Sequence, residues 1–427
     1  MDQVLLFPKH EAYQHTGIPW LGDIPAHWAL KKNKYLFSEK KTTVGKQSSD
    51  YKLLSLTLKG VIVRDMDNPQ GKFPAEFNTY KIVNPNDLIF CLFDIEETPR
   101  TVGLAQQHGM ITGAYTVIEC QPEVSAQYLS YYYLSLDFDK RLKSLYTGLR
   151  KVIQRDTFMS IKSPVPPRAE QDRIANFLDQ KTAEISQVIA KKQRLIELLS
   201  EQKAILINQA VTKGLNPHVP MRDSGVPWLG EIPHHWSIVR SKALFGERKE
   251  RARKGDKQLT ASQKYGVIFQ DEFMEREGRR VTQVFLNSEI LKHVEEGDFV
   301  ISMRSFQGGI EYCPYSGATS SAYIPIVPLK HVYTQFFKYL FKSDSYIRAL
   351  GSTSNLVRDG QALRFENFSL VDLPIVPESE QKRIANFLGQ KTQENDDAIA
   401  KEKCEIGLLI ELKAALINQA VTGKIKI

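Results

Sequence analysis

The stretch EQDRIANFLDQKT, from Glu170 to Thr182, returns almost unchanged as EQKRIANFLGQKT from Glu380 to Thr392, 210 residues later. The heptapeptide LINQAVT at residues 206–212 returns in full at residues 416–422, at the same offset. Two separate stretches repeated at one offset indicate a tandem duplication. Because the period is far above the roughly 20 to 50 residues of a solenoid repeat, each unit must be a domain with its own core.

The duplication also extends toward the N-terminus. IPWLGDIPAHW, from Ile18 to Trp28, returns as VPWLGEIPHHW from Val226 to Trp236, 208 residues later. All four tryptophans of the chain lie in these two motifs. Stacking of these rings on nucleic-acid bases is one interpretation, although the bases of a B-form duplex are not open to stacking. A buried anchor for the first strand of each domain is the favoured interpretation.

Length and composition are typical of a globular protein with two to four domains. Of the 427 residues, 42% are hydrophobic and 25% are charged, and no apolar run approaches the roughly 18 residues of a membrane span. The N-terminus lacks a signal-peptide pattern, so we expect a cytoplasmic protein. The four cysteines show no C-x-x-C spacing and the nine histidines form no H-E-x-x-H motif. We therefore expect neither a disulfide framework nor a metal site.

Within each unit, short strands give way to one long helix. Runs such as DLIFCLF at 87–93 and GAYTVIEC at 113–120 have the length and β-branched content of strands, whereas residues 125–145 and 333–350 have helical patterns. This mixture predicts an α/β (α+β) fold for each domain.

The junctions PVPPRAEQ and PIVPESEQ then place prolines directly before a glutamate suited to the first turn of a helix. We predict long helices over about 168–212 and 378–421. The predicted segments are a first domain at 1–167, a helix at 168–214, a second domain at 215–377 and a helix at 378–427.

The first long helix carries an imperfect heptad pattern of apolar residues. Its members are Leu178, Ile185, Val188, Leu195, Leu199 and Leu206. A simple core face is the alternative, but no other predicted element is long enough to cover the pattern. We therefore expect the two long helices to form an antiparallel coiled coil with pseudo-twofold symmetry. The stretches between the repeated motifs differ, so the two domains would present unlike recognition surfaces on one scaffold.

These motifs, in this order and twice over, resemble the specificity subunit of type I restriction-modification enzymes. The resemblance rests on TGIPWLGDIPAHW and SGVPWLGEIPHHW, on PVPPRAEQDRIANFL and PIVPESEQKRIANFL, and on the two copies of LINQAVT. It implies two target-recognition domains that each read one half of a bipartite DNA site, with helices that set the spacer. It also implies two docked methyltransferase subunits, further restriction and translocase subunits, and S-adenosylmethionine and ATP with magnesium on those partners. No cofactor is expected in this chain.

The net charge of +8 favours a polyanionic partner, and basic residues cluster at equivalent places in the two units. Arginine suits guanine, glutamine suits adenine, and lysine suits phosphate. We predict DNA contacts from Lys40, Lys41, Arg150, Lys151, Arg248, Lys249, Arg251, Arg304, Gln307 and Arg358. A solvated loop surface is the alternative for each of these residues.

The repeated LINQAVT motif predicts partner docking at related positions. The candidates are Asn208, Gln209, Asn418 and Gln419. The alternative is that these residues only cap the helices.

Catalytic motifs are missing from the sequence. No G-x-x-x-x-G-K-[ST] loop occurs, and the Glu-x-Lys fragments are short enough to occur by chance. We therefore expect a non-catalytic subunit. Two alternatives remain, a stand-alone DNA-modifying or DNA-cleaving enzyme with an unrecognised active site and a coiled-coil scaffold protein.

Overall fold

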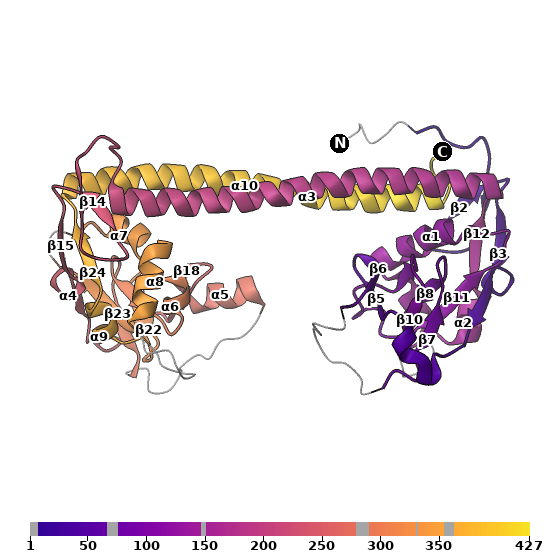
Figure 1. The fold of residues 1–427 in the computed structure, drawn as a ribbon, viewed down its shortest axis with the longest axis horizontal. Helices are drawn as coiled ribbons and strands as arrows, with labels where there is room; N and C mark the ends of the chain where they lie inside the picture. Colours follow the sequence, from indigo (N-terminus) through magenta and orange to yellow (C-terminus); the bar gives the residue numbers. More distant parts are fainter. Residues whose placement is uncertain (1–6, 66–75, 147–150, 279–289, 330–331, 354–362) are drawn as a thin grey trace. The chain divides into compact units, whose positions relative to one another are not determined.

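The computed structural model describes residues 7–65, 76–146, 151–278, 290–329, 332–353 and 363–427 (Figure 1). The chain forms two compact units, of which unit 1 comprises residues 1–192 and 404–427 and unit 2 comprises residues 193–403. Each long helix therefore contributes part of its length to each unit. This division by contacts differs from the four predicted segments because the helix halves pack into the cores of the units.

The elements of unit 1 are short strands, two short helices and parts of both long helices. Its strands are β1 (Tyr13–His15), β2 (Asp23–Pro25), β3 (Ala29–Lys32), β4 (Phe37–Lys40), β5 (Leu54–Thr57), β6 (Gly60–Val63), β7 (Lys81–Val83), β8 (Leu88–Phe90), β9 (Val102–Leu104), β10 (Gly109–Ile111), β11 (Thr116–Cys120) and β12 (Lys162–Val165). Its helices are α1 (Ala126–Phe138), α2 (Arg155–Ser160), the first part of α3 (Arg168–Lys213) and the last part of α10 (Glu378–Val421).

Unit 2 repeats this series. Its strands are β13 (Met221–Asp223), β14 (Glu231–Pro233), β15 (Ser237–Arg240), β16 (Phe245–Glu247), β17 (Leu259–Ser262), β18 (Gly266–Phe269), β19 (Lys292–Val294), β20 (Phe299–Ile301), β21 (Glu311–Tyr312), β22 (Gly317–Thr319), β23 (Ile324–Pro328) and β24 (Asp372–Ile375). Its helices are α4 (Ser241–Leu244), α5 (Gln270–Glu277), α6 (Ser305–Gly308), α7 (Thr334–Leu340), α8 (Asp344–Ser352), α9 (Phe365–Ser369), the last part of α3 and the first part of α10.

The two units share one topology, which confirms the duplication and the mixed fold class. The largest sheet of unit 1 has the order β4-β11-β8-β9, and that of unit 2 has the order β16-β23-β20-β21. The smaller pairs also correspond, since β1-β2, β3-β12, β5-β6 and β7-β10 match β13-β14, β15-β24, β17-β18 and β19-β22. The hydrogen-bonded pairs among these strands are all antiparallel.

Both long helices begin where the sequence predicts. The backbone N–H of Glu170 donates to Pro167 O at 2.8 Å, and that of Glu380 donates to Pro377 O at 2.8 Å. Each proline fixes the backbone at the entry, and each glutamate places a negative charge at the positive end of the helix dipole. The helices predicted over about 168–212 and 378–421 are confirmed to within one residue.

The heptad assignment was wrong at Val188 and Leu195, which are 42% and 41% exposed. The inward positions of α3 instead follow a regular alternation of four and three residues. They are Ile185, Ile189, Lys192, Ile196, Leu199, Lys203, Leu206 and Ala210. The sequence pattern misled because apolar residues occupy neighbouring positions, as in Leu195 and Ile196, whereas two inward positions carry lysine.

Within each unit the helix halves run antiparallel. In unit 1, Lys192 is paired with Glu405 and the Lys413 ammonium donates to Ser186 Oγ at 2.8 Å. In unit 2, Lys203 is paired with Asp396 at 2.6 Å. The expected antiparallel pairing of the two helices is thereby confirmed inside each unit.

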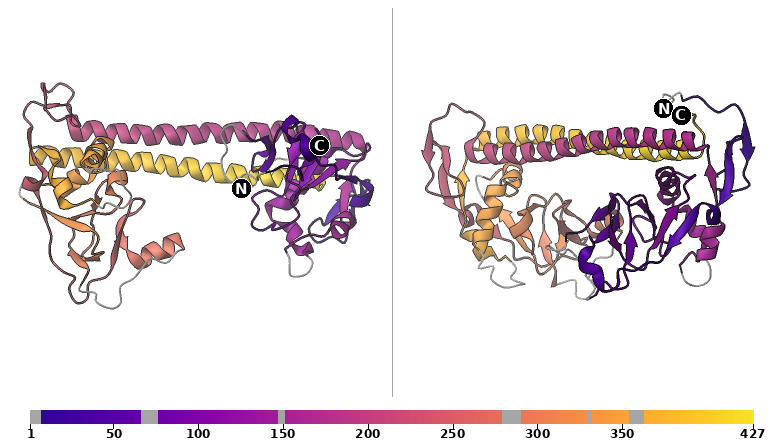
Figure 2. Two further views of the ribbon diagram at one scale, coloured as in Figure 1. Left: turned by 60° about the horizontal axis from the view of Figure 1, so that its bottom comes forward. Right: turned by 45° about the vertical axis from the view of Figure 1, so that its right-hand side comes forward.

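In each unit a short helix packs between the long helices and the strands. Figures 1 and 2 show α1 between the long helices and the strands of unit 1, with α7 in the corresponding place in unit 2. Tyr128 of α1 is fully buried, and its hydroxyl donates to Val421 O at 3.1 Å. Phe336 and Phe337 of α7 pack in one cluster with Ile384 and Leu388 of α10. Burial of these aromatic rings supplies much of the hydrophobic stabilisation.

Candidate nucleic-acid interface

In both units, two strands of the largest sheet end at the same edge. β4 and β8 both pair antiparallel with β11, so they are parallel to each other, and Lys40 and Ile89 share the partner Val117. In unit 2, Glu247 of β16 and Phe299 of β20 share the partner Ile326. The strands β4 and β8 end at one edge of the sheet in unit 1, and β16 and β20 end at the corresponding edge in unit 2. We call this the carboxyl edge of each sheet. Loops that leave the sheet there lie close together.

The carboxyl edge of unit 1 presents two of the predicted lysines. Lys41 is exposed directly after β4. Lys151 reaches the edge because Phe93, three residues after β8, forms a bridge with Val152. The Lys151 ammonium donates to Glu97 at 2.9 Å, and this bond raises the pKa of Lys151. Both lysines are exposed.

The carboxyl edge of unit 2 presents four of the residues predicted to contact DNA. Lys249 and Arg251 follow β16 and are exposed, although one Arg251 N–H donates to Ile290 O at 3.0 Å. Arg304 and Gln307 follow β20 and are also exposed. Gln263 Nε2 donates to Arg304 O at 3.1 Å and so holds this loop against the β17–β18 hairpin. Two arginines, a lysine and a glutamine are a suitable combination for phosphate and base-edge contacts.

Two other predicted residues point back into the domains. Lys40 Nζ donates to both oxygens of the buried Asp87 at 2.8 and 3.0 Å. At the equivalent place Arg248, with a side chain 11% exposed, binds Asp298 at 2.6 Å and 3.1 Å. Hydrogen bonding to Asp298 is the largest of the effects that raise the pKa of Arg248. Their predicted DNA contacts are untested, and the observed geometry assigns both cations a role inside the fold.

The two carboxylates sit in matching turns. Asp87 accepts from the Asn84 N–H at 2.7 Å, and Asp298 accepts from the Glu295 N–H at 2.9 Å. The residue before each has a positive φ, 68° at Asn86 and 94° at Gly297, which asparagine and glycine tolerate. Each cation therefore anchors a strand start. Arg150 and Arg358 lie outside the described residues.

Comparisons with known proteins agree with this architecture. Residues 233–407 match the family described as "Type I restriction modification DNA specificity domain". The chain is 23% identical over 449 aligned residues to a putative type I restriction enzyme MjaX specificity subunit of Methanocaldococcus jannaschii, with 99% of each chain covered. The chain belongs to the type I restriction specificity subunits.

Solved structures agree at the level of the fold. A chain from a study of complex assembly and conformational transition in a type I R-M system aligns with a TM-score of 0.66 and 12% identity, covering 93% of this chain and 98% of that one. The HsdS subunit from Thermoanaerobacter tengcongensis aligns with a TM-score of 0.51 and 14% identity, covering 94% and 98%. In the described part of this specificity subunit, no helix is both long and apolar enough to cross a bilayer.

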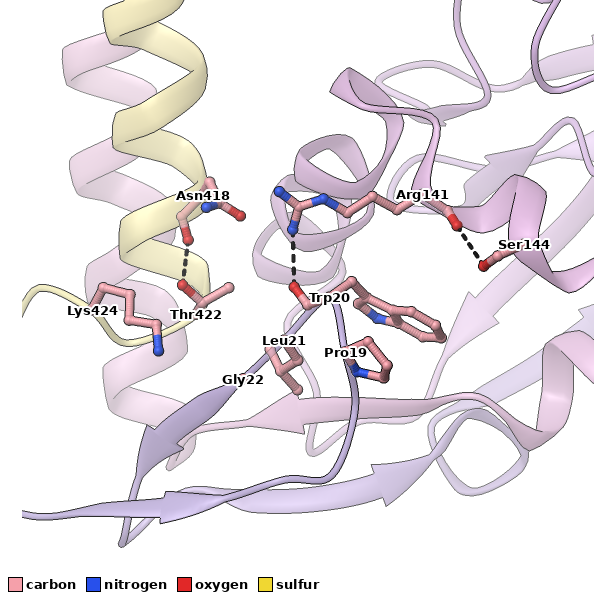
Figure 3. Close-up of a pocket in the computed structure, with 9 residues that line it drawn as sticks. All are labelled: Pro19, Trp20, Leu21, Gly22, Arg141, Ser144, Asn418, Thr422 and Lys424. Atoms are coloured by element: carbon pink, nitrogen blue, oxygen red, sulfur yellow. Dashed lines mark hydrogen bonds between the residues drawn. The ribbon is translucent and has the colours of Figure 1, made fainter.

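The predicted docking residues of the specificity subunit differ between the repeats. In unit 1, Asn418 lines a pocket of about 640 Å³ between the Trp20 loop, Arg141 and the end of α10 (Figure 3). Asn418 Oδ1 is buried and has no hydrogen-bond partner among the described residues. In unit 2, Asn208 Oδ1 accepts the Ser345 hydroxyl. Gln209 is exposed and Gln419 is partly buried.

A contact that the sequence did not predict joins each tryptophan motif to its long helix. Trp28 Nε1 donates to Glu170 Oε1 at 3.1 Å, and His27 Nε2 lies 2.9 Å from Glu170 Oε2. In unit 2, Trp236 Nε1 donates to Glu380 at 3.1 Å, and His235 Nε2 lies 2.8 Å from the same carboxylate. We call each set the Trp–His–Glu lock. The sequence signal for this contact was the repetition of HW after 208 residues and of EQ after 210 residues.

The tryptophans follow the buried interpretation. Trp28 and Trp236 are 2% and 1% exposed, and Trp20 and Trp228 are partly buried against the same cores. Stacking on bases is therefore not available to Trp28 or Trp236 in this structure.

Proposed function

We propose that this specificity subunit reads a bipartite, asymmetric DNA site, with one half-site for each unit. The single observation that supports this proposal is that one sheet topology presents unlike polar loops at the same carboxyl edge in both units. Lys41 and Lys151 occupy that edge in unit 1, whereas Lys249, Arg304 and Gln307 occupy it in unit 2. Unlike side chains on like scaffolds would recognise unlike base sequences.

The chain itself would be non-catalytic. In this proposal two methyltransferase subunits supply S-adenosylmethionine, and restriction and translocase subunits supply ATP and magnesium chemistry. The name of the M. jannaschii relative and the R-M assembly study support such partners. Methyltransferase docking would use the ends of the long helices near Asn208, Gln209, Asn418 and Gln419. The pocket at Asn418 supports this position because it leaves a buried amide oxygen free to accept a hydrogen bond.

The experiment that tests the proposal is a domain exchange. The chain is co-expressed with the methyltransferase gene nearest to it, and methylated positions are mapped across the genome by single-molecule sequencing. We expect a split motif with a fixed gap. Exchange of residues 17–164 for the same segment of another family member should change one half of that motif and leave the other unchanged. A loss of both halves would contradict independent reading, and an unmethylated genome would contradict the assignment.

The long helices would set the gap between the half-sites. An insertion of seven residues keeps the heptad phase and lengthens a helix by about 10 Å, which corresponds to about three base pairs. The insertion belongs after Lys192 in α3 and after Lys403 in α10, because the boundary between the units falls there in both helices. We expect the methylated motif to keep both half-sites and to gain about three base pairs of spacer. A methylated motif with the original spacer would show that the length of the helices does not determine the gap between the half-sites.

A further inference from the structure

Three side chains from separate segments of unit 1 meet at the start of α3. His10 comes from the N-terminal segment, His27 from the loop after β2, and Glu170 from the first turn of α3. One ligand atom from each of the three lies within 4.8 Å of the other two. His27 Nε2 is 2.9 Å from Glu170 Oε2, and His10 Nε2 is 3.9 Å from Glu170 Oε1. Two imidazoles and a carboxylate are a common ligand set for zinc.

His10 provides the second, independent observation. Its side chain is 6% exposed, and its Nε2 is a buried nitrogen without a hydrogen-bond partner among the described residues. The distance of 3.9 Å to Glu170 is too long for a hydrogen bond. The ring is held in place by aromatic contacts with Tyr13, His27 and Trp28. A nitrogen held in this way and left unpaired is suited to receive a ligand.

We propose that His10, His27 and Glu170 bind one divalent transition metal ion, with zinc as the best match. Neighbouring ligand atoms of a tetrahedral zinc lie roughly 3.3 Å apart. His27 Nε2 and Glu170 Oε2, at 2.9 Å, are already within that distance, so the main adjustment is a shift of His10 Nε2 toward Glu170 by about 0.6 Å. The half-exposed His27 leaves the fourth position open to water. Trp28 Nε1 already donates to Glu170 Oε1 at 3.1 Å and would orient the carboxylate from behind.

The ion would fasten the N-terminal segment to the long helices of unit 1. This segment already contacts the end of the chain, since the Lys426 N–H donates to Pro8 O at 2.8 Å. It also contacts α3, because Phe7 and Phe177 pack edge to face at 5.4 Å. A metal ion at His10 would therefore join the first residues of the described chain, the start of α3 and the tail after α10.

Unit 2 provides the internal control. His235 and Glu380 repeat His27 and Glu170, but His218, which lies 208 residues after His10, is exposed. Among the described residues, the group at His10 is the one set of three that could hold a metal. The lock is thus duplicated, while the third ligand is present in unit 1 alone.

The test is zinc binding by the full chain after chelation and dialysis, measured by calorimetry, with metal content measured by mass spectrometry. We expect one zinc ion per chain and an unfolding temperature raised by roughly 5 °C or more at zinc about a hundredfold above Kd. His10→Asn and His27→Asn should each weaken binding at least about 100-fold. His218→Asn and His235→Asn, the matched changes in unit 2, should bind zinc as the unaltered chain does.

Two results would overturn the proposal. One is an unaltered chain that retains no zinc at micromolar concentrations, and the other is equal loss of zinc in His235→Asn and His27→Asn. Because His27 is half exposed, its replacement should leave the far-ultraviolet circular dichroism unchanged, so lost binding is not explained by unfolding. Cobalt substitution adds a direct readout, since d–d absorption of tetrahedral intensity is expected in the unaltered chain and absent in His10→Asn.

Discussion

The two units of this specificity subunit share the same buried ion pair but differ in the exposed side chains at the carboxyl edge. Lys40 with Asp87 and Arg248 with Asp298 form the same buried pair in the two copies. One residue further along the chain, Lys41 and Lys249 are exposed. Adjacent basic residues therefore have opposite roles, because strand pleating turns one side chain toward the sheet and leaves the next outside. A cluster of basic residues in the sequence can therefore contain both residues that stabilise the fold and residues that are candidates for DNA contact.

The same comparison holds at the long helices. The Trp–His–Glu lock is present in both units with nearly equal distances. The additions to this scaffold differ, because His10 completes a three-residue group in unit 1 and Ser345 occupies the Asn208 amide in unit 2. Duplication followed by divergence would leave this pattern, because the buried contacts that stabilise the fold are retained while the polar groups around them change.

The largest expected effect tests the buried pairs. Arg248→Ala removes the cation beside Asp298, which is 1% exposed, and should destabilise unit 2 by about 3 kcal/mol. Lys40→Ala should cost unit 1 less, about 1 to 2 kcal/mol, because the Lys40 side chain is 21% exposed and water can replace it. Hydrogen exchange of peptides from β20 and β8 measures the two units separately in the full chain.

Lys249→Ala serves as the control, and its exchange rates should match those of the unaltered chain. If Lys40→Ala and Arg248→Ala gave equal losses, the degree of burial of the cation would not determine the energy of these pairs.

The second prediction concerns the exposed edge of unit 2. Arg304→Ala should weaken DNA binding by the assembled complex by about 1 to 3 kcal/mol and relax the sequence preference of one half-site. Lys249→Ala should weaken binding to all sequences and lower the slope of log affinity against log salt by about one. Binding titrations at several salt concentrations, with variant half-sites, separate the two. An unchanged preference in Arg304→Ala would remove this residue from base reading.

Much of the fold was predictable because it depends on residues that occur twice. The duplication, the helix bounds and the buried Trp28 and Trp236 were all visible as motifs that repeat after 208 or 210 residues. The seam of the coiled coil was not, since Leu195 and Ile196 are equally apolar and only packing shows that Ile196 faces inward. An inward Lys192 also contradicts the simple rule that the seam is apolar.

The candidate site was less predictable for a different reason. Charge and residue type are the same for Lys40 and Lys41, and the partner that separates them, Asp87, lies 47 residues away in the sequence. The group formed by His10, His27 and Glu170 shows the same limit, because no local spacing links residues from three segments. Long-range pairing determines which polar residues are free, and a local motif does not contain that information.

The third prediction tests the equality of the two locks. Trp28→Phe and Trp236→Phe each remove the N–H donor to a largely buried glutamate while keeping an aromatic ring in the core. We expect each to cost about 1 to 2 kcal/mol, with the larger loss for Trp28 because Glu170 is 8% exposed and Glu380 is 13% exposed. Hydrogen exchange at the first turns of α3 and α10 measures each lock. A loss confined to one helix would mean that the locks are alike in geometry but not in energy.

The smallest expected effect concerns the lysines at inward positions of α3. Lys192 is paired with Glu405 in unit 1, and Lys203 is paired with Asp396 in unit 2. Asp396 is 53% exposed and Glu405 is 38% exposed, so solvent screens both pairs and each should contribute under about 1 kcal/mol. Replacement of either lysine by leucine should therefore stabilise the pairing of the helices, since it exchanges a screened ion pair for apolar contact at a seam position. Thermal unfolding at low and high salt measures this, and a stability that falls in Lys192→Leu but rises in Lys203→Leu would show that the two halves of the seam are not equivalent.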